Sequence, residues 1–348
     1  MRESHTRLMR LLLIPVLYLY VSLLIGFTFL VFPGINGNPY SMFPDMVFGR
    51  ASRPFVYRAL MPSAIRLAAA IISEPARQKI ITKARHDPIL SVAVPLLRWE
   101  WEYLPEYGIA SVLVTGCFLG YAFLLRSLVL RFFACPDWIS QVVPVIGMLI
   151  VPAFYRYYNY IYDPCTLLTF TAALSCLAAG RTGMWYLCLA FAAINKETSI
   201  LLPGLFFLYN AGSMKRRSLA LHLALQIALL AVVKALISYA YRGNPGSFLE
   251  FHLIDHTVAY LGHPGRLIGF LAFAALWAGL LAPGWRLSPR FLQKGLFVVL
   301  GPLVGMALVF GFVDETRGYY EAVPFLVLLM VPTIKVALGG GEKERDGE

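Results

Sequence analysis

Lysine, arginine and carboxylate side chains gather at the ends of several apolar runs in this chain. Lys196 and Glu197 stand side by side in "AAINKETSILL", residues 192–202. The other stretches of this kind are "YRYYNYIYDP" (155–164), "FLEFHLIDH" (248–256) and "VDETRGYYE" (313–321). A carboxylate can take a proton from a reacting group, and a lysine or arginine can stabilise a developing anion. Such a set suits acid–base chemistry beside a bound anionic group.

Two other interpretations of these charges stay open. Lys196 could pair with Glu197 or Glu315 and only hold helix ends together. His252 and His256 are four residues apart and would share one face of a helix, so with Asp255 they could bind a metal, although such a group more often caps a loop or lines a pocket. The chain lacks a dinucleotide fingerprint, a P-loop, an H-E-x-x-H zinc motif and a G-x-S-x-G elbow. We therefore expect no metal and no cofactor.

The elements that carry these residues must lie in a membrane. The 348 residues are 59% hydrophobic and only 14% charged, whereas a soluble chain is about 25% charged. Many apolar runs approach the ~20 residues that cross a bilayer. The formal net charge of +11 belongs mostly to residues that flank these runs, which favours membrane lipid headgroups over nucleic acid as partners. The composition predicts an all-α polytopic membrane protein.

About ten transmembrane helices are expected in a single transmembrane domain over residues 1–348, with no internal repeat. The predicted spans are 11–32, 108–125, 140–155, 162–179, 183–195, 198–212, 218–240, 267–284, 295–312 and 320–338. Basic residues of short loops favour the cytoplasmic side. This rule places the N-terminus and "SMKRRS" (213–218) inside, and residues 339–348 form a disordered cytoplasmic tail.

Residues 183–212 are predicted to form two helices instead of one. A single helix of that length would be ~45 Å long, which exceeds the ~30 Å core of a bilayer. Two helices that meet near Asn195–Glu197 also keep "SMKRRS" on the inner side. The junction should then lie near the outer face, together with the other polar stretches.

The first extracytoplasmic loop, residues 33–107, is large and mixes basic with apolar residues. The stretch "RPFVYRALMPSAIRLAAAII" (53–72) has the composition of an amphipathic interfacial helix, and a second helix is expected over 76–86. This loop could also be a lid without chemistry of its own.

The layout and four short stretches resemble a family of membrane enzymes. "RPFVYRALMP", "YIYDP", "NKETSILL" and "ETRGYYEAVP" resemble patterns in little-characterised bacterial proteins of the GT-C superfamily of integral-membrane glycosyltransferases. The resemblance implies a sugar donor linked to polyprenyl phosphate and a glycan or lipid acceptor. It also implies a bacterial inner-membrane protein whose active site faces the periplasm.

The resemblance also implies roles for individual residues. Asp45, shortly after the first span, matches the acidic catalytic base of the first outer loop, with Asp163 and Glu197 as alternates. Asp45 stands alone, which argues against a D-x-D metal site. The leaving phosphate needs cations at the headgroup level. The candidate phosphate-binding set is Lys196 and Arg317 first, then Arg58, Arg156 and Lys234, with Glu315 beside them.

A second hypothesis is a multi-span transporter or flippase for a lipid or an anionic solute. Broken helices with charges at depth also mark transporter sites. The lack of a repeat and the outward position of the charged residues favour the enzyme. A scaffold without a site would leave those residues unexplained.

Overall fold

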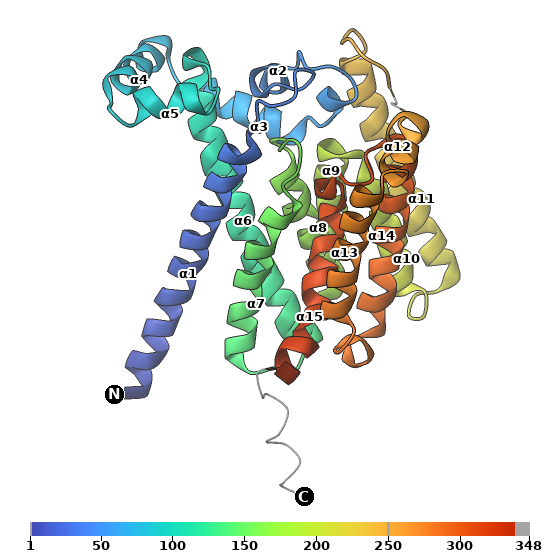
Figure 1. The fold of residues 1–348 in the computed structure, drawn as a ribbon. Coiled ribbons are helices and arrows are strands. Elements are labelled where there is room, and N and C mark those ends of the chain that lie inside the picture. Colours follow the sequence, from blue (N-terminus) through green and yellow to red (C-terminus); the bar gives the residue numbers. More distant parts are fainter. Residues whose placement is uncertain (1, 249–250, 338–348) are drawn as a thin grey trace, which may run out of the picture.

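The computed structural model describes residues 2–248 and 251–337, and the predicted tail 339–348 lies outside them. The described residues form helices and connecting turns without any strand (Figure 1). This confirms the all-helical class.

A helix occupies each of the ten predicted spans. These helices are α1 (Arg2–Phe29), α6 (Leu104–Phe132), α7 (Asp137–Ile150), α8 (Asp163–Ala178), α9 (Thr182–Asn195), α10 (Leu201–Asn210), α11 (Arg216–Ala240), α13 (Pro264–Leu281), α14 (Arg290–Phe310) and α15 (Val323–Ala337). In the described part of the chain, seven segments are long and apolar enough to cross a membrane. Helices α8, α9 and α10 have only 16, 14 and 10 residues. The chain is a helical polytopic membrane protein, and its three short helices distinguish it from a simple ten-span bundle.

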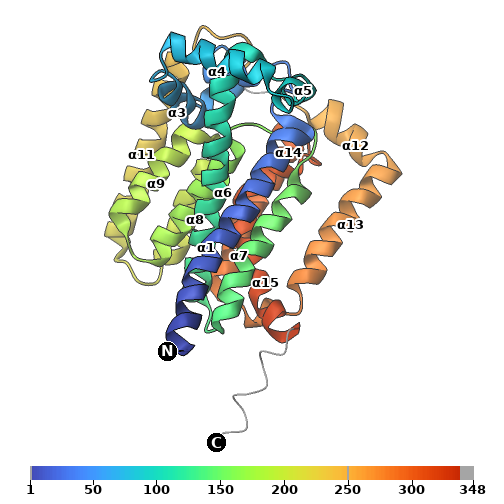
Figure 2. The same ribbon diagram turned by 90° about the vertical axis from the view of Figure 1, so that its left-hand side faces the viewer.

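The core of the bundle lies around α6, α8 and α15. Within the apolar window of α15, 72% of the residues are buried, against 6% for α13. Small residues let the helices approach closely. A Cβ on Gly147 would lie 2.6 Å from Leu125 of α6. Helix α13 stands at one edge of the bundle, and α11 lies at the opposite edge (Figure 2).

The first loop forms a cap over one end of the bundle, which we call the loop end (Figure 1). It contains α2 (Phe43–Val47), α3 (Leu60–Ala69), α4 (Glu74–His86) and α5 (Leu90–Leu96). The predicted helix over 76–86 is confirmed. The stretch 53–72 is helical only in α3, because Pro54 and a short turn at Phe55–Tyr57 precede it. Arg77 binds the buried carboxylate of Glu106 at 2.7 Å and so joins α4 to α6.

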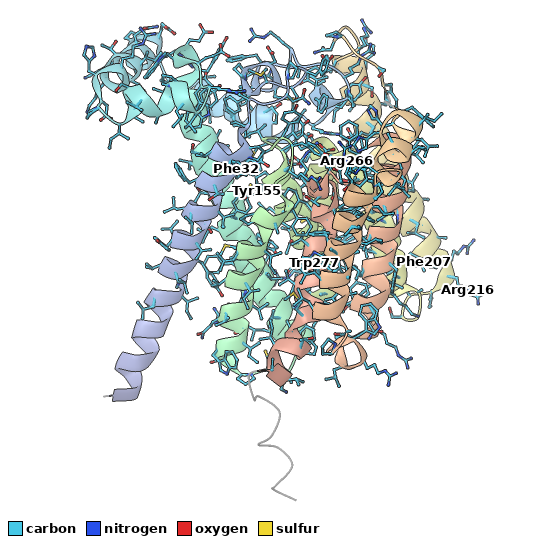
Figure 3. All side chains as sticks on the ribbon, viewed as in Figure 1. Phe32, Tyr155, Phe207, Arg216, Arg266 and Trp277 are labelled. Atoms are coloured by element: carbon cyan, nitrogen blue, oxygen red, sulfur yellow. The ribbon has the colours of Figure 1, made fainter. Side chains whose placement is uncertain are left out.

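The predicted break between α9 and α10 is also confirmed. Helix α9 ends at Asn195, and Lys196 has an extended backbone with φ −159° and ψ 149°. A short turn, Glu197–Ile200, then leads into α10. Phe207 and Arg216 lie well below the loop end (Figure 3). The chain therefore reaches the loop end at Lys196 and turns back.

Candidate functional site

The polar residues of five separate segments meet at the loop end. We call them the ionic cluster, and its members are Arg58, Asp163, Lys196, Glu197, Lys234, Glu315, Arg317 and Glu321. The first loop provides Arg58, the start of α8 provides Asp163, and α11 provides Lys234. The α9–α10 break and the turn Thr316–Ala322 before α15, with Glu315 just ahead of it, provide the others. Every sequence-predicted site residue except Asp45 and Arg156 belongs to this cluster.

Arg317 connects two carboxylates within the cluster. Its guanidinium lies 2.6 Å from Glu315 and 3.5 Å from Asp163. The same guanidinium lies 3.8 Å from the ring centroid of Tyr160. The side chain is only 7% exposed. Arg317 is therefore held by two charges and one aromatic face.

Arg58 brings the first loop into the cluster. Its Nε lies 3.2 Å from Glu197, and its Nη1 donates to the hydroxyl of Tyr162. Lys234 approaches the other oxygen of Glu197 at 3.6 Å. Burial alone would raise the pKa of Glu197, but the charges of Arg58 and Lys234 outweigh that effect and lower the pKa to about 2. Glu197 therefore stays ionised at neutral pH.

Lys196 pairs with a residue that the sequence-based site did not include. Its ammonium lies 2.9 Å from Glu321, whose side chain is fully buried, and Thr198 donates to the same carboxylate. The sequence suggested Glu197 or Glu315 as structural partners of Lys196, and both bind other cations instead. The repeated acidic and basic residues of "VDETRGYYE" were the only sequence signal for Glu321.

An aromatic stack supports the two arginines. The rings of Phe55, Tyr160 and Tyr162 follow one another with centroid distances of 5.4 Å at each step. Arg58 also lies over Tyr162, at 4.7 Å from the ring centroid. Since Phe55 belongs to the first loop and the tyrosines precede α8, the stack fixes the loop against the bundle.

Several buried polar atoms of this region have no hydrogen-bond partner among the described residues. They include Asp163 Oδ1, Asn195 Oδ1, Tyr320 OH and Glu321 Oε2. All four residues are at most 1% exposed. Burying a polar group without a partner costs about 1–3 kcal/mol. These atoms are therefore suited to hydrogen bonds with water or with the hydroxyl groups of a substrate.

The charges of the ionic cluster balance. The four cations are Arg58, Lys196, Lys234 and Arg317, and the four carboxylates are Asp163, Glu197, Glu315 and Glu321. Buried charges are tolerated when they are paired in this way. The two carboxylates that are most exposed are Glu197, at 42%, and Glu315, at 19%. Each of them binds one of the two arginines.

Two of the sequence-predicted site residues form ion pairs outside the cluster. Asp45 is 40% exposed, and among the described residues its carboxylate pairs only with Arg50, at 3.2 Å. Arg156 binds the buried carboxylate of Asp314 at 2.9 Å. Asp45 and Arg156 thus form ion pairs with residues outside the cluster, and the expectation that they share one centre with Lys196 and Arg317 stays a prediction.

One histidine of "FLEFHLIDH" binds a carboxylate next to the ionic cluster, whereas the side chain of Asp255 lies outside the described residues. His256 Nε2 lies 3.0 Å from Asp314, so it is part of the same contact as Arg156. Among the side chains that the structure describes, no group of three or more His, Cys, Asp or Glu residues could hold a metal ion.

Comparison of the chain with protein-family models, with characterised proteins and with solved structures finds no match. The glycosyltransferase resemblance therefore remains a hypothesis that rests on the sequence, and the function must be inferred from the site itself.

Proposed function

We propose that the ionic cluster binds the phosphate of a lipid-linked sugar donor and that the chain transfers the sugar to a glycan or lipid acceptor. The observation that carries this proposal is the convergence of two buried cations, Lys196 and Arg317, and the partly buried Arg58, from three separate segments at one end of a membrane bundle. A lipid carrier keeps its phosphate at the headgroup level, where such cations can reach it. Intramembrane ionisable residues of this kind are expensive and usually serve a function.

The carboxylates of Glu197 and Glu315 hold the arginines ready for the phosphate. They are the two most exposed carboxylates of the cluster, so an arriving phosphate meets them before the buried carboxylates. The phosphate can replace them on Arg58 and Arg317, because a guanidinium binds phosphate through two parallel hydrogen bonds. The displaced carboxylates then turn toward solvent.

Asp163 is the carboxylate best suited to act as the general base. It is fully buried beside Arg317, and its Oδ1 has no partner among the described residues. Glu197, with a pKa of about 2, is a weak base, because an efficient base has a pKa near the working pH. Asp45 lies outside the cluster.

In the proposed step, Asp163 takes the proton of the acceptor hydroxyl, and the acceptor oxygen bonds to the anomeric carbon. The bond from that carbon to the phosphate oxygen breaks, and the phosphate leaves as an anion on Arg58 and Arg317.

The test uses purified protein in lipid nanodiscs with radiolabelled polyprenyl-phosphate sugars. Wild type should transfer or hydrolyse the sugar of at least one donor. Asp163→Asn should lower the rate by about 10²–10⁴-fold, the usual contribution of a general base, and should still bind donor. Arg317→Gln should lose donor binding, and Asp45→Asn should change the rate less than threefold.

Four results would contradict this proposal in different ways. A normal rate in Asp163→Asn would remove that residue as the base, and a large loss in Asp45→Asn would restore Asp45 to that role. Failure of the wild type with every donor would argue against the transferase. Movement of an intact donor across the bilayer without transfer would favour a flippase.

A further inference from the structure

A second polar site lies beside the ionic cluster, at the top of α13. A cavity of about 450 Å³ opens there between α13, the segment 153–156 and the segment 314–316. Three basic side chains line it, namely Arg156, His263 and Arg266. Figure 3 shows Tyr155 and Arg266 near the loop end and Trp277 deeper in the bundle.

The cavity has more positive than negative charge. Its one carboxylate, Asp314, is 1% exposed and already binds Arg156 and His256, while the hydroxyl of Tyr157 also donates to it. Arg266 lies 5.9 Å from the ring centroid of Tyr260. Among the described residues, no carboxylate lies within salt-bridge distance of Arg266. An anion in the cavity would give this arginine a charged partner that the described residues do not supply.

The lower wall of the cavity is apolar and continues onto an open helix face. Gly269, Phe270 and Phe273 of α13 form this wall. The same helix exposes Ile268 at 65% and Leu276 at 60%. A ligand with a charged head and long apolar chains would contact both the basic lining of the cavity and the apolar face of α13. A small soluble anion would contact only the basic lining.

We propose that this cavity binds the phosphate of an anionic bilayer lipid, with Arg266 and Arg156 on the phosphate and the acyl chains along α13. Basic pockets between membrane helices at the headgroup level are suited to such lipids. The site is separate from the ionic cluster and needs no transfer reaction. It is nevertheless next to the cluster, because Asp314 and Thr316 line the cavity while Glu315 and Arg317 belong to the cluster.

The test measures lipid retention by native mass spectrometry. Wild-type protein is reconstituted in phosphatidylcholine nanodiscs that contain a rising fraction of phosphatidic acid, and the bound anionic lipid is counted after release. Wild type should retain phosphatidic acid, and Arg266→Gln should weaken retention by about tenfold, as expected for loss of one charge-assisted contact. Arg242→Gln is the matched control, because Arg242 also lies over a tyrosine ring, Tyr239, but does not line the cavity.

Two further arms separate the possible sources of the phosphate. Gly269→Trp should block the apolar wall and reduce lipid retention, while thermal unfolding confirms that the variant is folded. Inorganic phosphate at 10 mM, on the order of ten times a weak-site affinity of 1 mM, should not displace the lipid. Equal loss in Arg242→Gln would overturn the proposal in favour of general surface charge. Displacement by inorganic phosphate, or normal retention in both Arg266→Gln and Gly269→Trp, would also overturn it.

Discussion

Glu197 is the residue that joins the first loop to the membrane helices. It binds Arg58 of the loop and Lys234 of α11 at the same time. Removing the Glu197 carboxylate would leave the partly buried charges of Arg58 and Lys234 without this partner. The identity of this one side chain therefore affects the cap, the break and α11 together.

The lowered pKa of Glu197 predicts an acid-sensitive contact. Since its pKa is about 2 in the folded chain and ~4.3 for a free glutamate, the ionised form stabilises the fold above about pH 4.3. That contribution is lost as the pH falls from about 4.3 to about 2. We expect the thermal midpoint of wild type to fall over this window, and the fall to be smaller in Glu197→Gln.

Thermal unfolding in nanodiscs from pH 7 to pH 2.5 measures this effect. Glu102→Gln is a suitable control, because the side chain of Glu102 makes none of the ion pairs found in the described residues, and its curve should follow wild type. Identical slopes for wild type and Glu197→Gln would show that the Glu197 contacts add nothing to stability.

At the residue scale, sequence patterns identified most members of the cluster but not their pairing. Asp163, Lys196, Glu197 and Arg317 stood out because charge is rare in apolar runs. Which carboxylate meets Lys196 depends on how the turn before α15 packs against the α9–α10 break, and those segments are more than 100 residues apart. The pairing of Asp45 was not foreseen either, because its carboxylate binds the nearby Arg50.

At the scale of elements, two loops clasp each other at the loop end. The amide of Arg53 donates to the carbonyl of Pro245 at 2.7 Å, and the side chain of Asn244 donates to the carbonyls of Gly49 and Ala51. Gly246 makes this approach possible, because its φ is +93° and an added Cβ would lie 2.5 Å from the carbonyl oxygen of Arg53. The cap is thus held by backbone contacts as well as by Arg58.

Gly246→Ala should loosen this clasp. Backbone strain of this kind costs about 1–3 kcal/mol, so we expect a lower thermal midpoint and faster hydrogen exchange at the amide of Arg53. Gly243→Ala is the matched control, since an added Cβ there meets nothing within 4 Å, and it should exchange like wild type. Unchanged exchange at Arg53 in Gly246→Ala would mean that this clasp does not hold the cap.

The positions of the helices could be predicted from hydropathy and helix-breaking residues more reliably than the ion pairs of the site could. Long apolar runs fix where helices lie, and the length argument predicted the break at Asn195–Glu197. The helix expected over 53–72 was too long, because a hydropathy pattern does not reveal the turn that begins at Pro54 and precedes α3. The clasp at Gly246 could not be foreseen, since it depends on the approach of two distant loops.

For the whole molecule, the alternation of helices predicts which loops share a side of the membrane. In a variant whose five cysteines are replaced, we expect single cysteines at Gln78 and Ser247 to react with an impermeant maleimide on intact cells. Cysteines at Arg181 and Ser213 should react only after the membrane is opened. All four positions are exposed in the structure.

Arg181 and Ser213 together test whether α9 and α10 each cross the membrane. Two crossings return the chain to the same side, so both positions must label alike. Opposite labelling of Arg181 and Ser213 would show that residues 183–212 cross only once. Labelling of Gln78 only after opening would invert the whole orientation.

The shortness of α9 has an electrical consequence for the ionic cluster. Its 14 residues span about 21 Å, against ~30 Å for the hydrocarbon core. With its start at the inner edge of that core, α9 would place Lys196 roughly a third of the way in from the outer edge, so a phosphate would move from the headgroup level into the core to reach it. A full crossing of one charge changes its energy by about 2.3 kcal/mol per 100 mV, and a third of that is about 0.8 kcal/mol. An anion that enters the cluster thus moves through part of the transmembrane voltage. Its affinity should change about fourfold for each 100 mV. The same protein would therefore bind its ligand with different affinity in an energised membrane and in a depolarised one.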